Sequence, residues 1–133
     1  MFYTMENKID IKFTIDDIGG EIAKQDSRYT VIDNTTLNNL VVSSTDLKAN
    51  KSTNGRAHVG QEEVYNFVRG WGQIEMINLN GKKQTITVEA GSVVLIPDGW
   101  FHRVHAGTEG IYFVSVSYTH LRAHETGRNL VCR

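Results

Sequence analysis

The stretch GSVVLIPDGWFHRV, residues 91–104, places a histidine shortly after a short apolar run. The run has the length and β-branched composition of a buried strand, and Pro97 is typical of a strand end because proline cannot donate a ladder hydrogen bond. Gly99 then permits a tight turn, because glycine adopts backbone conformations that other residues avoid. We expect a new strand to follow, on which His102 and Val104 share one face.

A second stretch, NGRAHVGQEEVYNFVRGWG at residues 54–72, sets His58 and Glu63 five residues apart, ahead of an alternating apolar pattern. Side chains alternate between the two faces of a strand, so Glu63, Tyr65 and Phe67 share one face. If that face is the interior of a small barrel, a carboxylate and an imidazole converge in an apolar lumen. A buried carboxylate is unfavourable without a partner, and a bound cation is the usual one.

Together the two stretches resemble the two-part signature of the cupin superfamily, specifically its small single-domain members. The half with the pattern G-x5-P-x-G-x2-H is matched without a gap by residues 91–102. The other half, G-x5-H-x-H-x4-E-x6-G, is matched at His58, Glu63 and Gly70. The resemblance covers about residues 40–115, and it implies a single jelly-roll β-barrel.

The resemblance also implies a divalent metal ion in the lumen, of which iron, manganese, zinc and nickel are the candidates. The ligands that it implies are His58, Glu63 and His102. The implied activities are those of sugar-phosphate isomerases or small dioxygenases, in which the metal polarises a substrate oxygen or binds dioxygen. Tyr65 and Trp100 are candidates for contacts with a small polar substrate in the pocket.

Two positions depart from the family pattern. Asn50 replaces the first motif glycine, which is a mild change because asparagine tolerates the left-handed conformation. Arg56 stands where the family has its first histidine ligand, and a protonated guanidinium cannot bind a metal cation. Three interpretations of Arg56 stay open: it points outward, it binds an anion in the lumen, or it is a sequence error. The alternative function is therefore a non-catalytic ligand-binding or regulatory cupin with a degraded metal site.

The rest of the sequence predicts an all-β protein without a sustained helical period. Residues 8–15 alternate apolar and polar side chains and predict a strand, residues 70–72 are expected to close the strand before them, and Asn80–Gly81 predicts a hairpin turn. We expect residues 1–36 to form strands and turns that pack on the barrel, and residues 37–115 to form the cupin barrel.

The remaining residues, 116–133, read VSYTHLRAHETGRNLVCR and resemble the translation of a sequencing adapter. We therefore expect them to be a non-native tail and exclude them from fold reasoning. His120 and His124 have the spacing of a helical metal pair but carry no weight for that reason. Cys132 is the one cysteine, so a disulfide framework is not expected and a reducing cytoplasm is the default.

Composition limits the partners that we expect. The chain has 133 residues, the size of one domain, and a formal net charge of −1 without a basic stripe, which disfavours nucleic acid. Its apolar runs are far shorter than the roughly 20 residues of a membrane span. The expected partners are a small-molecule ligand and a second copy in a homodimer, because small cupins commonly pair through sheet edges.

Overall fold

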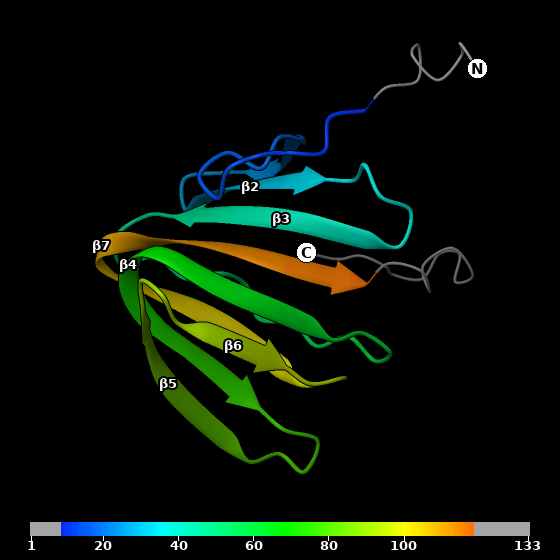
Figure 1. Cartoon of the computed structure of the whole chain (residues 1–133). Helices are drawn as coiled ribbons and strands as arrows, with labels where there is room; N and C mark the ends of the chain where they lie inside the picture. Colours follow the sequence, from blue (N-terminus) through cyan, green and yellow to red (C-terminus); the bar gives the residue numbers. More distant parts are fainter. Residues whose placement is uncertain (1–8, 119–133) are drawn as a thin grey trace.

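The computed structural model describes residues 9–118, and this range consists of strands, turns and loops (Figure 1). The all-β prediction is therefore confirmed, and the described range contains no helix that could cross a membrane. The strands are β1 (Glu21–Gln25), β2 (Tyr29–Asn34), β3 (Leu40–Leu47), β4 (Glu63–Ile77), β5 (Lys83–Glu89), β6 (Val93–Ile96) and β7 (Phe101–Tyr118).

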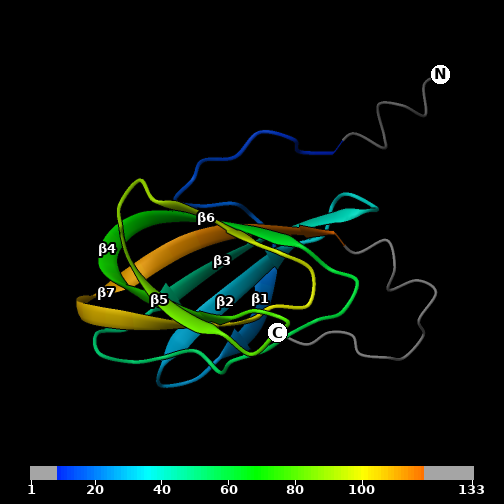
Figure 2. The same ribbon diagram turned by 90° about the horizontal axis from the view of Figure 1, so that it is seen from below.

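The strands pair antiparallel in the order β1-β2-β3-β7-β4-β5, and β6 pairs with β4. The long strands β4 and β7 run together over nearly their full length, from the pair Glu63↔Ser117 to the pair Ile77↔Phe101. Because β6 joins the first half of β4 and β5 joins its second half, β4 and β7 connect all parts of the sheet. Figures 1 and 2 show the sheet curling into an open barrel.

Strand β4 bends at Gly70 and Gly72, where its register with β7 shifts. A Cβ atom on Gly70 would lie 2.1 Å from the carbonyl oxygen of Gly110, and one on Gly72 would lie 2.2 Å from that of His105. The glycines thus let the two backbones approach more closely than side chains would allow. The expectation that the strand ends here is wrong, because the irregular pairing absorbs the bend and the strand continues to Ile77.

The inner face of the barrel follows the predicted alternation. Glu63, Tyr65 and Phe67 are all buried and alternate with less buried neighbours on β4, and His102 and Val104 do the same on β7. The apolar core consists of Tyr29, Val31, Leu47, Tyr65, Phe67, Ile74, Met76, Val88, Val94, Ile96, Val104, Ile111 and Phe113. A carboxylate and an imidazole therefore do lie inside a largely apolar barrel.

The N-terminal part differs from the expectation in two ways. Residues 9–15 form no strand, and their one ladder contact is an isolated bridge between Thr14 and Asp17. An alternating pattern gives a segment an apolar and a polar face, but the segment becomes a strand only if another strand pairs with it. No strand among the described residues pairs with residues 9–15. Strands β1 and β2, in contrast, pair in series with β3, so they are part of the barrel sheet rather than a layer packed on it.

The end of the N-terminal segment, residues 15 and 16, is attached to the outer face of the sheet. The hydroxyl of Tyr112 donates a 2.9 Å hydrogen bond to the carbonyl oxygen of Ile15, and Asp16 pairs with Arg69. The guanidinium of Arg69 lies 4.2 Å from the centre of the Tyr112 ring, and Ile18 packs in a small cluster with Tyr112. This second cluster fixes the chain at Ile18, ahead of β1.

The end of the sheet bears on the expectation that residues 116–133 are a non-native tail. Strand β7 runs through Val116–Tyr118, and Ser117 is buried, so the first residues of the expected tail lie in the sheet. His120, His124 and Cys132 lie outside the described residues.

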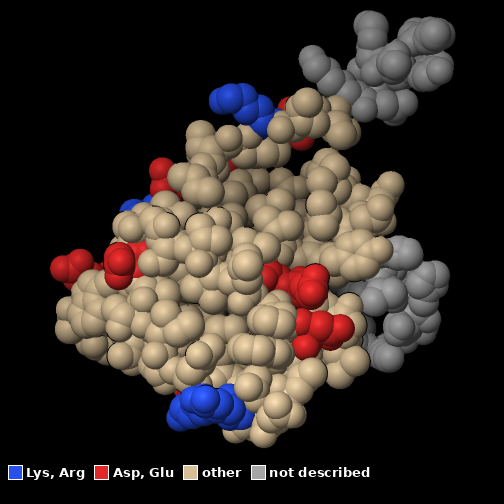
Figure 3. Space-filling model, turned by 60° about the horizontal axis from the view of Figure 1, so that its bottom comes forward, with Lys and Arg blue, Asp and Glu red and all other residues tan. Residues whose placement is uncertain are grey.

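The face in Figure 3 carries scattered acidic and basic side chains and no continuous basic surface. The exclusion of nucleic acid as a partner stays a prediction.

Candidate functional site

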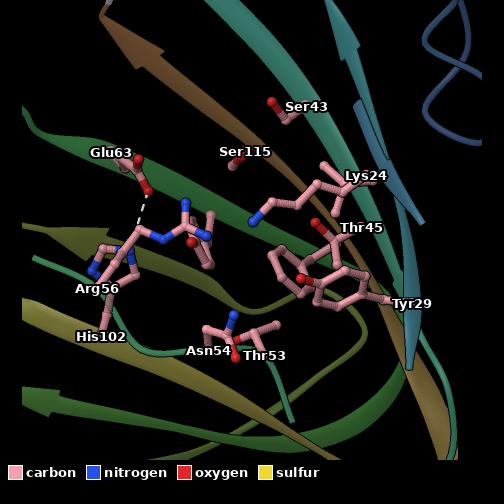
Figure 4. A pocket seen from close by; sticks show the side chains of 13 residues that line it. Lys24, Tyr29, Ser43, Thr45, Thr53, Asn54, Arg56, Glu63, His102 and Ser115 are labelled. Carbon is pink, nitrogen blue, oxygen red and sulfur yellow. Dashed lines mark ion pairs between the residues drawn. The ribbon is translucent and has the colours of Figure 1, made fainter. Parts of the chain in front are cut away.

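A pocket opens into the barrel beside Glu63 and His102 (Figure 4). Its walls combine charged groups, hydroxyl groups and aromatic rings, and its volume is about 40 Å³. It is lined by Lys24, Tyr29, Val31, Ser43, Thr45, Thr53, Asn54, Arg56, Glu63, Tyr65, His102, Phe113 and Ser115.

Arg56 is held in this pocket by its backbone. Its N–H donates to the carbonyl oxygen of His102 at 3.2 Å, and the N–H of His102 donates to the carbonyl oxygen of Arg56 at 2.9 Å. Residues opposite each other in an antiparallel bridge project to the same face, so the buried His102 side chain brings Arg56 inward. Of the interpretations left open by the sequence, the structure supports the lumen position for Arg56 rather than the outward one.

Glu63 and His102 face each other at the base of the pocket. Oε1 of Glu63 lies 3.4 Å from Nε2 of His102, and both side chains are more than nine-tenths buried. The other ring nitrogen, Nδ1, lies 3.2 Å from the carbonyl oxygen of Trp100, which can only accept a hydrogen bond. This contact places a proton on Nδ1 and directs Nε2 toward Glu63 and the pocket.

Aromatic rings form the apolar wall of the pocket. The Tyr65 ring meets the His102 ring edge-on at 5.6 Å between centroids and stacks on Phe113 at 4.9 Å. Phe67 continues the aromatic cluster behind them. These contacts fix the imidazole plane, so the direction in which Nε2 points is determined by packing.

The structure does not bring all of the predicted site residues together. His58 is absent from the pocket lining, because the chain leaves the β7 ladder after Arg56 and the His58 carbonyl accepts a hydrogen bond from the Gly99 N–H instead. Trp100 also lies outside the lining and packs against the apolar core. Within residues 9–118, no group of three or more His, Cys, Asp or Glu side chains is placed to hold a metal ion.

The described residues therefore do not fit the three-ligand metal site that the sequence implies. Two of the expected ligands, Glu63 and His102, remain as a pair, and the third, His58, is absent from the lining. The cationic Arg56, which stands where the family has a further histidine, lines the pocket instead. A guanidinium adds positive charge beside a cation and offers it no lone pair. The pocket residues therefore do not form the complete metal centre that the family pattern implies.

Several pocket residues were not anticipated from the sequence. Lys24 comes from β1, Tyr29 from β2, Thr45 from β3 and Ser115 from β7. None lies in the two motif stretches, and each belongs to a strand whose inner face is defined only by its register with the neighbouring strands. Figure 4 shows Lys24 and Arg56 pointing into the pocket from opposite walls.

A separate polar chain links three elements near the barrel mouth. Nε2 of His105 donates to Oε1 of Glu75 at 2.9 Å, and Nδ1 of His105 lies 2.6 Å from Oγ of Ser52. The hydrogen bond from His105, together with Lys83, lowers the pKa of Glu75 below its usual value. His105 is half-buried and links the Ser52 loop to β4.

No family model and no curated protein matches this sequence. Solved structures do match: a tryptophan-to-phenylalanine variant of the oxalate decarboxylase of Bacillus subtilis aligns with a TM-score of 0.70 and 19% identity. That alignment covers 82% of this chain and 29% of the decarboxylase. Another structure of the same enzyme, described for its Mn(II) centres, aligns with a TM-score of 0.68 and 20% identity, again over 82% and 29% of the two chains.

The chain thus spans less than a third of the length of these neighbours, and at such identities the likeness concerns the fold alone. Oxalate decarboxylase is a cupin-fold protein. The antiparallel strand order, the inward carboxylate and imidazole, and this structural likeness agree with one another. The described part of the chain is a single cupin jelly-roll β-barrel.

Proposed function

We propose that this cupin barrel binds a small polar molecule directly through its side chains, in the pocket around Arg56, Glu63 and His102. The observation that carries the proposal is the position of Arg56, whose guanidinium points into the pocket where the family pattern has a metal-binding histidine. An arginine fork binds oxygen atoms of a ligand without the help of a metal ion.

The surrounding groups support a binding role. Glu63 and His102 are buried, and the Tyr65–Phe113 stack holds His102 in place, so the polar groups are pre-organised. A small number of convergent polar groups beside aromatic side chains is a usual feature of a small-molecule site. The proposal corresponds to the alternative function that the sequence analysis based on Arg56, a non-catalytic ligand-binding or regulatory cupin.

Ligand titration in the presence of EDTA tests the proposal. Small polar molecules, both neutral and charged, are titrated into ¹⁵N-labelled protein, and amide shifts are mapped onto the structure. We expect at least one of them to cause saturable shifts around Glu63 and His102, and His102→Ala to abolish these shifts. Binding that requires added metal, or shifts confined to the outer surface, would contradict the proposal.

A metal-dependent enzyme is the second candidate, and one observation favours it. Nε2 of His102 is a buried side-chain atom without a hydrogen-bond partner, and it faces the Glu63 carboxylate. These two side chains would hold a divalent ion, which would polarise an oxygen atom of a substrate, as in isomerase-like or dioxygenase-like cupins. Manganese is the first ion to test, because the oxalate decarboxylase to which this barrel is similar has Mn(II) centres.

A further inference from the structure

We propose that Arg28, which lies outside the pocket lining, orients two pocket residues, Tyr29 and Asn54, so that both donate hydrogen bonds to an acceptor oxygen atom of the ligand. The inference rests on the proposed binding function. It adds the kind of ligand atom that this wall of the pocket receives and a positioning role for Arg28. Tyr29 and Asn54 both line the pocket, and neither belongs to the site that the sequence predicts.

The guanidinium of Arg28 contacts both pocket residues at once. Its Nη1 donates to Oδ1 of Asn54 at 2.9 Å, and its Nη2 donates to the hydroxyl oxygen of Tyr29 at 3.2 Å. The two acceptors come from different parts of the chain, because Tyr29 begins β2 and Asn54 lies in the loop between β3 and β4. Since both bind one guanidinium, the amide and the hydroxyl lie side by side in the wall of the pocket.

Asp26 and the turn between β1 and β2 hold this guanidinium in place. The Asp26 carboxylate accepts hydrogen bonds from Nε of Arg28 at 3.3 Å and from Nη2 at 2.8 Å. These hydrogen bonds lower the pKa of Asp26 to about 2. The backbone of Arg28 is fixed as well, because its carbonyl oxygen accepts from the N–H of Lys48 at 2.8 Å. The direction of the guanidinium is therefore set by the protein before a ligand arrives.

The contact with Arg28 decides which end of the Asn54 amide faces the pocket. A guanidinium has donors only, so the amide must turn its oxygen toward Arg28. Its Nδ2 amino group, with two donor hydrogens, is then directed away from Arg28, and Figure 4 shows this nitrogen turned toward the interior of the pocket. Without Arg28 the amide can turn over and present its oxygen there instead.

The same reasoning applies to the hydroxyl group of Tyr29. It accepts a hydrogen bond from Arg28, so its own proton is left for a second acceptor. The Tyr29 side chain is 4% exposed, and the guanidinium lies 4.6 Å from the centre of its ring, so packing restricts the ring. Two neutral donors in one wall complement a carbonyl, carboxylate or hydroxyl oxygen, whereas a ligand that places a donor there leaves polar groups unpaired.

The size of the pocket limits the molecules that can test this. A volume of about 40 Å³ corresponds to about three water molecules at roughly 10–15 Å³ each. Acetone is a suitable probe because it is small and has an acceptor oxygen but no donor. Isobutene is the matched probe, because it has the same shape without the oxygen.

Both probes are titrated into the ¹⁵N-labelled whole chain in EDTA, and NMR signals are followed. We expect acetone to shift the side-chain amide signals of Asn54 saturably, and to bind about threefold or more tightly than isobutene. Asn54→Asp keeps an acceptor for Arg28 but removes the donor hydrogens, and Tyr29→Phe removes the hydroxyl but keeps the ring. Each should weaken acetone binding about threefold or more.

Arg28→Gln tests the positioning role. It should weaken acetone binding about threefold or more in the wild-type background, but not in a chain that carries both Asn54→Asp and Tyr29→Phe, where no donor is left to orient. Arg103→Gln is the matched control, because Arg103 also binds the loop that carries Asn54, through its Nε and the carbonyl oxygen of Thr53 at 2.9 Å. It should leave acetone binding unchanged.

The outcomes separate this inference from the proposed function. Equal binding of acetone and isobutene, or wild-type acetone affinity in both Asn54→Asp and Tyr29→Phe, overturns the assignment of the ligand atom. A loss from Arg28→Gln that persists in the double background, or an equal loss from Arg103→Gln, overturns the positioning role. Pocket binding of other small polar molecules that none of these variants weakens overturns the inference but leaves the proposed function intact. No pocket binding of any molecule overturns both.

Discussion

The Nε2 atom of His102 lies 3.4 Å from Oε1 of Glu63, and it has no hydrogen-bond partner although it is buried. The other ring nitrogen, Nδ1, lies against the carbonyl oxygen of Trp100, so Nε2 is the ring atom that faces the carboxylate. A metal cation or a donor group of a ligand placed between Nε2 and the carboxylate would interact with both. The pair is therefore a place in the barrel where a bound species would interact with two buried polar groups at once.

The first prediction concerns metal affinity and Arg56. Arg56→His should strengthen the binding of Mn²⁺ by one or more factors of ten, each worth about 1.4 kcal/mol, because it removes a positive charge and adds an imidazole lone pair. Calorimetric titration of the purified protein with Mn²⁺ measures the change. Arg56→Gln separates the two effects, since it removes the charge without adding a strong ligand.

His102→Ala should abolish whatever metal binding is present in either background. Equal affinity in the wild type and Arg56→His would show that position 56 does not contribute to a metal site. Tight binding that survives His102→Ala would place the metal elsewhere in the chain.

The second prediction concerns the bend in β4. Gly70 has φ of +80°, and a Cβ there would lie 2.1 Å from a backbone oxygen, whereas Gly81 has φ of +85° with nothing within 4 Å. Gly81→Ala should cost about 1–2 kcal/mol of unfolding free energy from backbone strain alone. Gly70→Ala should cost more, about 3 kcal/mol or above, because the β4 and β7 backbones must also separate. Urea unfolding of both variants tests this, and equal losses would contradict it.

The sequence predicted the parts of the barrel that local chemistry determines. Pro97 and Gly99 end one strand and turn the chain, Gly99 has φ of +80°, and His102 follows on an inner face. Asn50 adopts φ of +62°, the left-handed conformation that was expected of it. The shared face of Glu63 and Tyr65 followed from period two alone.

The remainder depends on pairing between distant segments. The bulge ahead of Lys24 is visible only in the register of β1 against β2, so no local pattern indicated that this lysine faces inward. The loop after Arg56 follows hydrogen bonds to the Gly99 turn, so the spacing from His58 to Glu63 did not bring His58 into the pocket. Spacing within a motif fixes faces in a strand, but it does not fix the path of a loop.

The third prediction concerns acid stability. The hydrogen bond from His105 and the contact with Lys83 lower the pKa of Glu75 below its usual 4.5 in the folded state. The stabilisation is therefore complete above pH 4.5 and is lost as the pH falls through the lowered pKa. Glu75→Gln should flatten the loss of stability as the pH falls below 4.5, measured by urea midpoints. Glu89→Gln, an exposed change on β5, is the control, and a wild-type slope in Glu75→Gln would contradict the prediction.

The last prediction concerns self-association. Ile9, Ile11, Phe13 and Ile15 alternate along an arm in which each of these side chains is more than 40% exposed, and Figure 1 shows the arm extending beyond β2 and β3. An alternating apolar segment without a strand partner within residues 9–118 is suited to pack against a second copy, and β1, at the edge of the sheet, offers backbone groups for it. We propose a homodimer formed in this way.

Light scattering at micromolar concentration should give the mass of a dimer. Ile11→Asp should shift the protein toward the monomer, because it places a charge in the centre of the arm, which the proposed dimer would bury. Val59→Asp, which alters a 94% exposed side chain in the loop before β4, should leave the dimer intact. A wild-type monomer would refute the proposal. A dimer that Ile11→Asp leaves as stable as Val59→Asp does would show that association uses a surface other than the arm.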